Sequence, residues 1–230
     1  MSWLRGIEFD GMLFDAGGVF VLPDPTVLGP LLAYYGGNVD VERHVRAHYH
    51  AMAVKSAAGS GERFWDEYDL AYVASVGVPE HERAAAALSL GRHRNAWTWR
   101  WPLTDNIAAL RRLHEAGMPI GVVSNASGQI EELLLRGGVC QVGPGDHVPV
   151  LVIIDSHVVG VAKPDPGIFD HALELFPGID RSRIAYVGDS VTMDIGGARA
   201  AGLHPILLDP YDDHPEADFD RIRSLADLLP

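Results

Sequence analysis

Short apolar runs recur along the second half of the chain, and segments of helical period lie between them. The runs share a length of four or five residues and a lack of strict alternation: 119–123, 150–154, 184–187 and 205–208. Such runs are typical of strands buried on both faces of a parallel sheet. Because right-handed crossovers place helices on both faces, the pattern predicts an α/β fold with a doubly wound parallel sheet.

The intervening segments predict helices. An apolar stripe at positions 107, 110 and 113 indicates one helix over 104–117. Further helices are expected over 129–136, 166–176 and 195–201. Ser224 and Asp227 resemble a capping box that begins a last short helix.

The first apolar run ends on an acid. Residues 7–15 predict a strand that finishes at Asp15, and Gly17 and Gly18 break it at once. A strand of this kind brings a carboxylate to the carboxyl edge of a parallel sheet, where ligands bind.

A long segment after this strand has a different texture. Residues 26–90 are Ala-rich and helical in period, and alternating Trp97, Trp99 and Trp101 then mark an extended return segment. The sequence therefore predicts a core of residues 1–22 and 99–230, with a helical unit inserted over residues 23–98.

Composition limits the class of protein. The 230 residues are 47% apolar, which is enough for a packed core. Since no apolar run approaches the ~20 residues of a membrane span, and the first residues lack a signal-peptide pattern, we expect a cytoplasmic protein without a membrane partner. Cys140 is the only cysteine, so an intramolecular disulfide is excluded. The net charge of −13 argues against a nucleic-acid partner but not against a small phosphorylated ligand.

Four segments that follow predicted strands, or lie beside them, carry candidate chemistry. The Asp15 carboxylate can act as a nucleophile, and its ordinary alternative is a capping acid. Ser124 and Asn125 can hold phosphoryl oxygens, although a Ser-Asn turn is common at strand ends. Lys163, one of two lysines in the chain, can neutralise a phosphoryl group, and its ordinary alternative is a surface position.

The fourth segment holds two acids five residues apart, Asp189 and Asp194. With Asp15 they offer the oxygen ligands that Mg²⁺ prefers, while the local alternative is helix capping. The order of the four segments, each beside the carboxyl end of a predicted strand, favours one composite site over four unrelated turns.

In this order the segments resemble the four motifs of the haloacid dehalogenase (HAD) superfamily, in its capped subfamily I type with a variant first motif, Asp-x-Gly-Gly. The resemblance implies a Rossmann-like core with an inserted α-helical cap. It implies that Asp15 is the nucleophile and that Lys163 orients it. It implies phosphate binding by Ser124, Asn125, Gly17 and Gly18. It implies Mg²⁺ binding by Asp15, the Gly17 carbonyl, Asp189 and Asp194.

Gly17 departs from the family pattern. In the family's phosphatases a second Asp at this position protonates the leaving group, and such help is worth ~10²–10⁴-fold. An Asp at position 17 is therefore expected to raise turnover. His44, His48, His50 and Tyr49 in the cap are candidate substitutes, but a solvated helix face is the favoured interpretation of the histidines.

The resemblance implies a Mg²⁺-dependent phosphatase that acts on a small phosphorylated metabolite through an aspartyl-phosphate intermediate, as a monomer or homodimer. A dehalogenase, which needs neither the second Asp nor a metal, is one alternative. A phosphonatase-like enzyme that uses Lys55 as a Schiff base is another, although an exposed helical Lys55 is the simpler interpretation. A catalytically weak, metabolite-binding homologue is the third.

Overall fold

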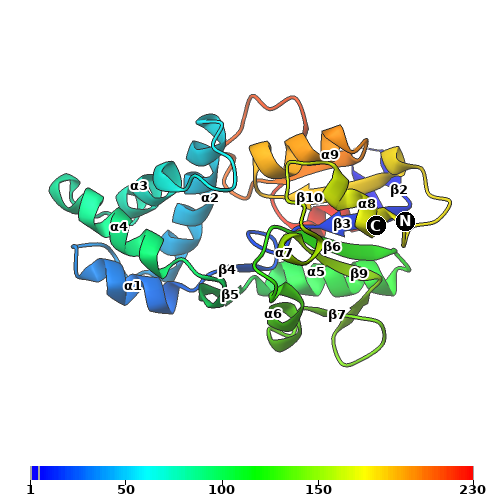
Figure 1. Cartoon of the computed structure of the whole chain (residues 1–230), viewed down its shortest axis with the longest axis horizontal. Coiled ribbons are helices and arrows are strands. Elements are labelled where there is room, and N and C mark those ends of the chain that lie inside the picture. Colours follow the sequence, from blue (N-terminus) through cyan, green and yellow to red (C-terminus); the bar gives the residue numbers. More distant parts are fainter. Residues whose placement is uncertain (1, 5, 230) are drawn as a thin grey trace.

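The computed structural model describes residues 2–4 and 6–229, which form a parallel sheet flanked by helices and a second group of helices beside it (Figure 1). The main sheet has six parallel strands in the order β12-β11-β10-β3-β6-β9. Their bounds are β3 Gly11–Phe14, β6 Ile120–Ser124, β9 Val152–Asp155, β10 Ile184–Gly188, β11 His204–Leu208 and β12 Asp220–Ile222. The chain winds outward from β3 first to one edge and then to the other, so the predicted doubly wound sheet is confirmed.

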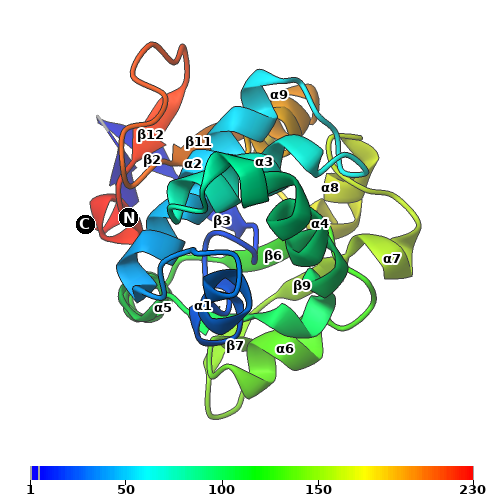
Figure 2. The same ribbon diagram turned by 90° about the vertical axis from the view of Figure 1, so that its left-hand side faces the viewer.

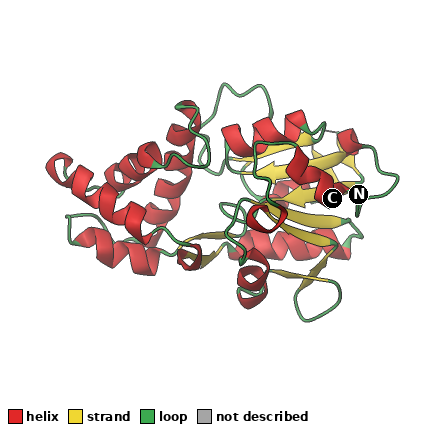
Figure 3. Ribbon diagram, in the orientation of Figure 1, coloured by secondary structure: helices red, strands yellow, loops and turns green. Residues whose placement is uncertain are grey.

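Helices cover both faces of this sheet (Figure 3). They are α5 Thr104–Glu115, α6 Ile130–Arg136, α7 Ser156–Val159, α8 Gly167–Leu173 and α9 Gly196–Ala200. Because side chains alternate along a strand, Met12 and Phe14 of β3 pack in the cluster that contains Leu110 of α5, whereas Leu13 packs with Phe169 of α8. The two clusters hold the sheet rigid, and its carboxyl edge is left open for a site.

The second group of helices, which we call the helical unit, comprises α1 Pro25–Ala33, α2 Val41–Ala57, α3 Asp66–Ser75 and α4 Arg83–His93. It has a hydrophobic core of its own, which includes Leu32, Tyr72 and Val73. In Figure 2 the unit lies in front of the sheet. Its two connections to the sheet, β4 Val21–Pro23 and β5 Trp99–Pro102, pair antiparallel. Within the described ranges, none of the helices combines the length and apolar character that a membrane crossing requires.

The structure corrects three local expectations. The strand expected over 7–15 is divided at Asp10, because β2 Ile7–Phe9 pairs antiparallel with β1 Ser2–Leu4 outside the main sheet. The run 150–154 is also divided, since its start belongs to β8 Val148–Val150, which pairs with β7 Cys140–Val142. The tryptophan segment contains a 3-10 turn over Ala96–Thr98 before β5 begins. The capping box at Ser224 and Asp227 is confirmed, and it begins a 3-10 turn over Leu225–Leu228.

Candidate active site

A cavity of about 250 Å³ lies between the carboxyl edge of the sheet and the helical unit. The core contributes to its lining the predicted residues Asp15, Gly17, Ser124, Asn125, Lys163, Asp189 and Asp194. The helical unit and the loops that join its helices contribute Met52, Lys55, Glu62 and Trp65. Segments separated by more than a hundred residues are thus brought together, as expected from the convergence of parallel strands at one edge. Gly18, the remaining predicted residue, lies beside the cavity and not in its lining.

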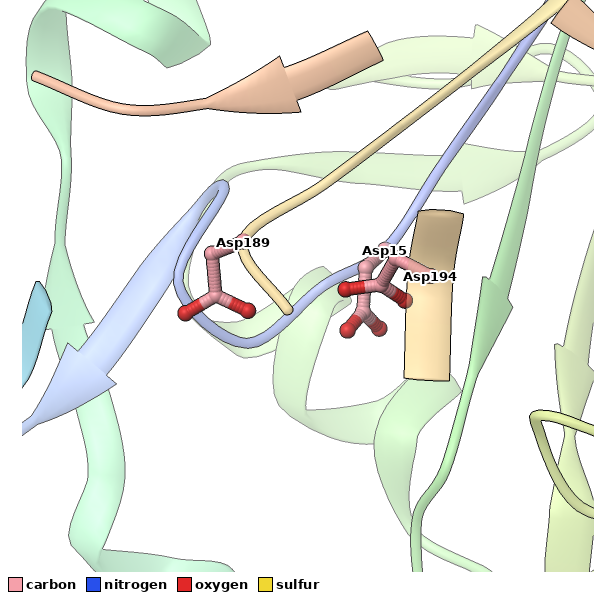
Figure 4. Close-up of side chains that lie close together, drawn as sticks. All are labelled: Asp15, Asp189 and Asp194. Atoms are coloured by element: carbon pink, nitrogen blue, oxygen red, sulfur yellow. The ribbon is translucent and has the colours of Figure 1, made fainter. Parts of the chain in front are cut away.

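Three of the carboxylates that line this cavity form a compact cluster (Figure 4). Asp15 follows β3, Asp189 follows β10, and Asp194 lies in the π-turn over Val191–Ile195. One oxygen atom from each lies within 4.8 Å of the others. Burial, with a smaller contribution from the two neighbouring acids, raises the pKa of Asp15 to about 7. A divalent cation would relieve this crowding of negative charge, and oxygen donors of this kind fit Mg²⁺.

Lys163 binds this cluster from within the core. Its Nζ lies 2.9 Å from Asp15 Oδ2 and 2.7 Å from Asp194 Oδ1. It also donates to the Tyr186 hydroxyl at 2.7 Å. Burial alone would lower the pKa of Lys163, but the two carboxylates hold it above its usual value. The ammonium is therefore fixed and charged, and the surface interpretation of Lys163 does not hold.

Ser124 is the last residue of β6, and Asn125, which follows it, joins two loops. Its Nδ2 donates to the Lys163 carbonyl at 3.0 Å, and its Oδ1 accepts from the Lys163 amide at 2.8 Å. These paired hydrogen bonds fix the backbone that carries the ammonium. Ser124 is buried and lines the same cavity.

Two glycines make room for the acids. Gly18 has a φ of +71°, and a Cβ there would lie 2.0 Å from Asp189 Oδ2. At Gly188 a Cβ would lie 2.2 Å from Asp194 Cγ. Both distances are far shorter than a van der Waals contact, so each glycine permits the close approach of one carboxylate.

Two of the three histidines of α2, His44 and His48, are buried, so the expectation of a solvated face is wrong for them. His44 and His48 are each 1% exposed, because their i,i+4 spacing turns both toward α3. His48 Nε2 lies 2.9 Å from Asp189 Oδ2, and its Nδ1 lies 2.9 Å from the Tyr68 hydroxyl. Since a carboxylate only accepts, the proton toward Asp189 is carried by Nε2.

Other side chains of α2 differ in where they point. The Tyr49 hydroxyl donates to the Gly18 carbonyl at 2.7 Å, which is a second contact between α2 and the loop after β3. His50 is half exposed and lies 3.6 Å from Asp213, away from the carboxylate cluster. Of the four cap candidates, His48 alone among the described residues therefore contacts one of the three clustered acids.

The space beside Gly17 is filled by Trp99. A Cβ at position 17 would lie 3.0 Å from Trp99 Cζ3 and 3.2 Å from its Cε3. An Asp at this position would therefore press on the indole ring. The expected gain in turnover from such a substitution now requires that Trp99 also move.

Lys55 is buried, not exposed as its ordinary interpretation suggested. It is 1% exposed, and its Nζ donates to the Ser60 carbonyl at 3.1 Å and the Gly61 carbonyl at 2.8 Å. Burial lowers its pKa. These bonds fix the loop that carries Glu62, whose Oε2 accepts from Asn125 Nδ2 at 2.9 Å.

Sequence reasoning did not identify Glu62 as a site residue. It follows the sequence Gly-Ser-Gly at 59–61, and an acid directly after a tight turn in the inserted unit is the one local signal of its position. The contact between this loop and the loop after β6 joins residues 63 positions apart, so no local pattern reveals it.

Comparison with known proteins places the chain in a family. A model for haloacid dehalogenase-like hydrolases matches residues 9–202. The chain therefore belongs to the haloacid dehalogenase-like hydrolases, and the family predicted from the four motifs is confirmed. Two solved structures share the fold over nearly the whole chain. A HAD phosphatase from Thermococcus onnurineus has a TM-score of 0.57 at 20% identity and 95% coverage of both chains, and a dehalogenase has 0.60 at 17% and 96%.

Curated relatives carry the names of several phosphatases. Glyceraldehyde 3-phosphate phosphatase of Methanopyrus kandleri is 28% identical over 165 residues, which cover 67% of each chain. Pyrimidine 5'-nucleotidase YjjG of Escherichia coli is 35% identical over 116 residues, 50% of this chain and 48% of that protein. Phosphoserine phosphatase of Thermus thermophilus is 32% identical over 159 residues, 66% and 58% of the two chains. The chain thus spans about two thirds of the first relative's length and about half of the second's.

Proposed function

We propose that the protein is a Mg²⁺-dependent phosphatase that acts on a small phosphorylated metabolite through an aspartyl-phosphate intermediate. The observation that carries this proposal is the environment of Asp15. Its carboxylate is held 2.9 Å from a buried ammonium, with two more acids within 4.8 Å, in a cavity between the sheet and the helical unit. The names of three relatives are those of enzymes that hydrolyse phosphate esters, which supports the same class of reaction.

In the proposed reaction, Asp15 attacks phosphorus and the bond to the leaving oxygen breaks. The ammonium of Lys163 offsets negative charge on the phosphoryl oxygens, and the Ser124 hydroxyl donates to one of them. Water then attacks phosphorus, and Asp15 leaves as a carboxylate. Bound Mg²⁺, held by Asp15, the Gly17 carbonyl, Asp189 and Asp194, would supply further positive charge at the phosphoryl group.

The cavity limits the size of the substrate. Its volume of about 250 Å³ lies below the ~300–1,000 Å³ of typical sites for drug-sized ligands. We infer that the helical unit, acting as the cap over residues 23–98, encloses a metabolite of a few carbon atoms. Met52 and Trp65 on the cap side would contact its leaving group.

Phosphate release from a panel of small phosphate esters, with Mg²⁺ and with EDTA, tests the proposal. The wild-type protein should release phosphate only with the metal, and Asp15→Asn should release none. Asp10→Asn is a matched control, because Asp10 is half exposed and pairs with Arg183 outside the cavity. Loss of release in both variants, or release by Asp15→Asn at the wild-type rate, would contradict the proposed role of Asp15. Halide release from 2-haloacids without phosphate release would instead favour the dehalogenase alternative.

One observation favours a second candidate, hydrolysis of a carbon–phosphorus bond. Lys55 lines the cavity, is almost fully buried and has a lowered pKa, as an amine that forms a Schiff base requires. Borohydride added with a 2-oxoalkylphosphonate would then trap a covalent adduct on Lys55, detectable by mass spectrometry. Lys55→Met should abolish the adduct, and the absence of any adduct on the wild-type protein would eliminate this candidate.

A further inference from the structure

Cleavage of an alkyl phosphate places negative charge on the leaving oxygen, which needs a proton. Position 17 has no side chain that could supply one. Asp15, Asp189 and Asp194 are gathered in the cluster that attacks phosphorus and fits the metal. The proton donor must therefore come from elsewhere in the cavity lining.

Glu62 is the one further carboxyl group that lines the cavity among the described residues. It lies in the loop between α2 and α3 of the helical unit, whereas the three clustered acids follow strands of the sheet or lie in the turn after β10. Its Oε2 accepts from Asn125 Nδ2 at 2.9 Å, and the same amide donates to the Lys163 carbonyl at 3.0 Å. Asn125 thus links the Glu62 carboxyl to the backbone of Lys163, whose ammonium contacts Asp15.

The backbone around Glu62 is held firmly for a loop. Lys55 Nζ donates to the carbonyls of Ser60 and Gly61, and Trp65 Nε1 donates to the Glu62 carbonyl at 2.6 Å. The Lys55 ammonium also lies 4.7 Å from the centre of the Trp65 ring. A carboxyl on a fixed backbone with a fixed oxygen is oriented for proton transfer.

We propose that Glu62 is the general acid and base of the phosphatase reaction, in the place of the side chain that position 17 lacks. As Asp15 attacks phosphorus and the phosphorus–oxygen bond breaks, the Glu62 carboxyl gives its proton to the leaving oxygen, and an alcohol departs. In the second step the Glu62 carboxylate takes a proton from the water that attacks the aspartyl phosphate, and phosphate and the Asp15 carboxylate are released. Oε1, the oxygen that Asn125 does not bind, is assigned to both transfers.

The electrostatic surroundings suit this role. Burial raises the pKa of Glu62, and the Asp194 carboxylate raises it further, while the Asn125 hydrogen bond and the ammonium groups of Lys163 and Lys55 lower it. The net result is an acid that holds its proton to a higher pH than a free Glu does, as proton donation near neutral pH requires.

This inference rests on the proposed function, and leaving-group chemistry separates the two. Glu62→Gln should lower release of phosphate from ethyl phosphate ~10²-fold or more. With 4-nitrophenyl phosphate, whose leaving group departs without a proton, the same variant should release one equivalent of nitrophenolate in a rapid burst. Slow turnover should follow, with an aspartyl phosphate that accumulates and is detectable by mass spectrometry.

Two further variants complete the design. Glu67→Gln is a matched control, because Glu67 Oε2 accepts from Ser60 Oγ at 3.0 Å and the change therefore disturbs the same loop without entering the cavity. This variant should retain wild-type activity on both ethyl phosphate and 4-nitrophenyl phosphate. Glu62→Asp keeps a carboxyl group and should restore part of the activity on ethyl phosphate, which an effect on folding alone would not predict.

The outcomes are distinguishable. If the wild-type protein gives no burst and no phosphate from any ester, the proposed function itself fails. If the wild-type protein is active and Glu62→Gln either retains its activity on ethyl phosphate or loses activity on both esters without a burst, the assignment of Glu62 is overturned.

Discussion

Replacing Asp15 by Asn should make the metal-free protein more stable above pH 7, although it removes the proposed nucleophile. Burial raises the pKa of Asp15 from 3.8 to about 7, against the attraction of Lys163. Each pH unit of such a difference corresponds to about 1.4 kcal/mol, so ionised Asp15 destabilises the folded state by about 4 kcal/mol. Asn resembles the protonated acid in shape and does not ionise, so the variant avoids this penalty.

The pH dependence gives this prediction its sign. Below pH 4 the carboxyl is protonated in both the folded and the unfolded protein, and the two variants should be equally stable. Between pH 4 and pH 7 the unfolded state has lost the proton that the folded state retains, so the wild type loses stability as pH rises. Above pH 7 both states are ionised and the difference of about 4 kcal/mol should remain constant.

Urea unfolding of both proteins in EDTA at pH 5 and pH 8.5 measures the effect. The variant should gain more at pH 8.5 than at pH 5. Saturating Mg²⁺ should then stabilise the wild type, by about 2.7 kcal/mol at a concentration 100 times the Kd, and the variant much less. An Asp15→Asn protein that is no more stable than the wild type at pH 8.5 in EDTA would refute the reasoning.

Three more substitutions follow from the geometry of the site. Gly17→Asp should cost about 1–3 kcal/mol of stability, because its side chain would press on Trp99, and it should leave phosphate release unimproved. Adding Trp99→Leu should recover stability and raise phosphate release. Thermal melts and initial rates measure the two effects. His48 Nε2 holds Asp189 Oδ2 at 2.9 Å, so His48→Leu should weaken Mg²⁺ affinity about 10–100-fold in a titration followed by tryptophan fluorescence. His48→Gln, which keeps a donor, should retain most of the affinity, and equal affinities in both variants would show that His48 does not position Asp189. Gly188→Ala should lower stability by at least about 2 kcal/mol, because its Cβ would lie 2.2 Å from Asp194 Cγ; an unchanged urea midpoint would show that the turn relaxes freely.

The sheet and its chemistry could be predicted because both leave local signals. The runs that become β6, β10 and β11 are apolar and short. Asp15 and Asp189 directly follow strands, and Ser124 is the last residue of one. The short edge strand β12 has no such local signal, because its sequence Asp-Arg-Ile contains no apolar run and its pairing with β11 depends on distant residues.

The inserted unit was harder to interpret because its burial depends on distant partners. His44 and His48 appear polar in sequence, yet the Tyr72 and Tyr68 hydroxyls that satisfy them lie 28 and 20 positions away. Lys55 is satisfied by backbone carbonyls, which leave no mark in the pattern of side chains. Spacing along the chain identifies none of these partners, which is why the pattern favours solvent for the two histidines and for Lys55.

The paired connections β4 and β5 have a consequence for how the helical unit could move relative to the sheet. Both crossings between the sheet and the helical unit run side by side there, so a rotation about this pair would carry the unit as one rigid body (Figure 1). The polar contacts between the unit and the core would then separate together, among them His48 with Asp189, Tyr49 with Gly18 and Glu62 with Asn125. If a substrate enters by this rotation, the same movement would also separate the proposed catalytic residues. The proposed site would then be complete only in the closed arrangement that the structure shows.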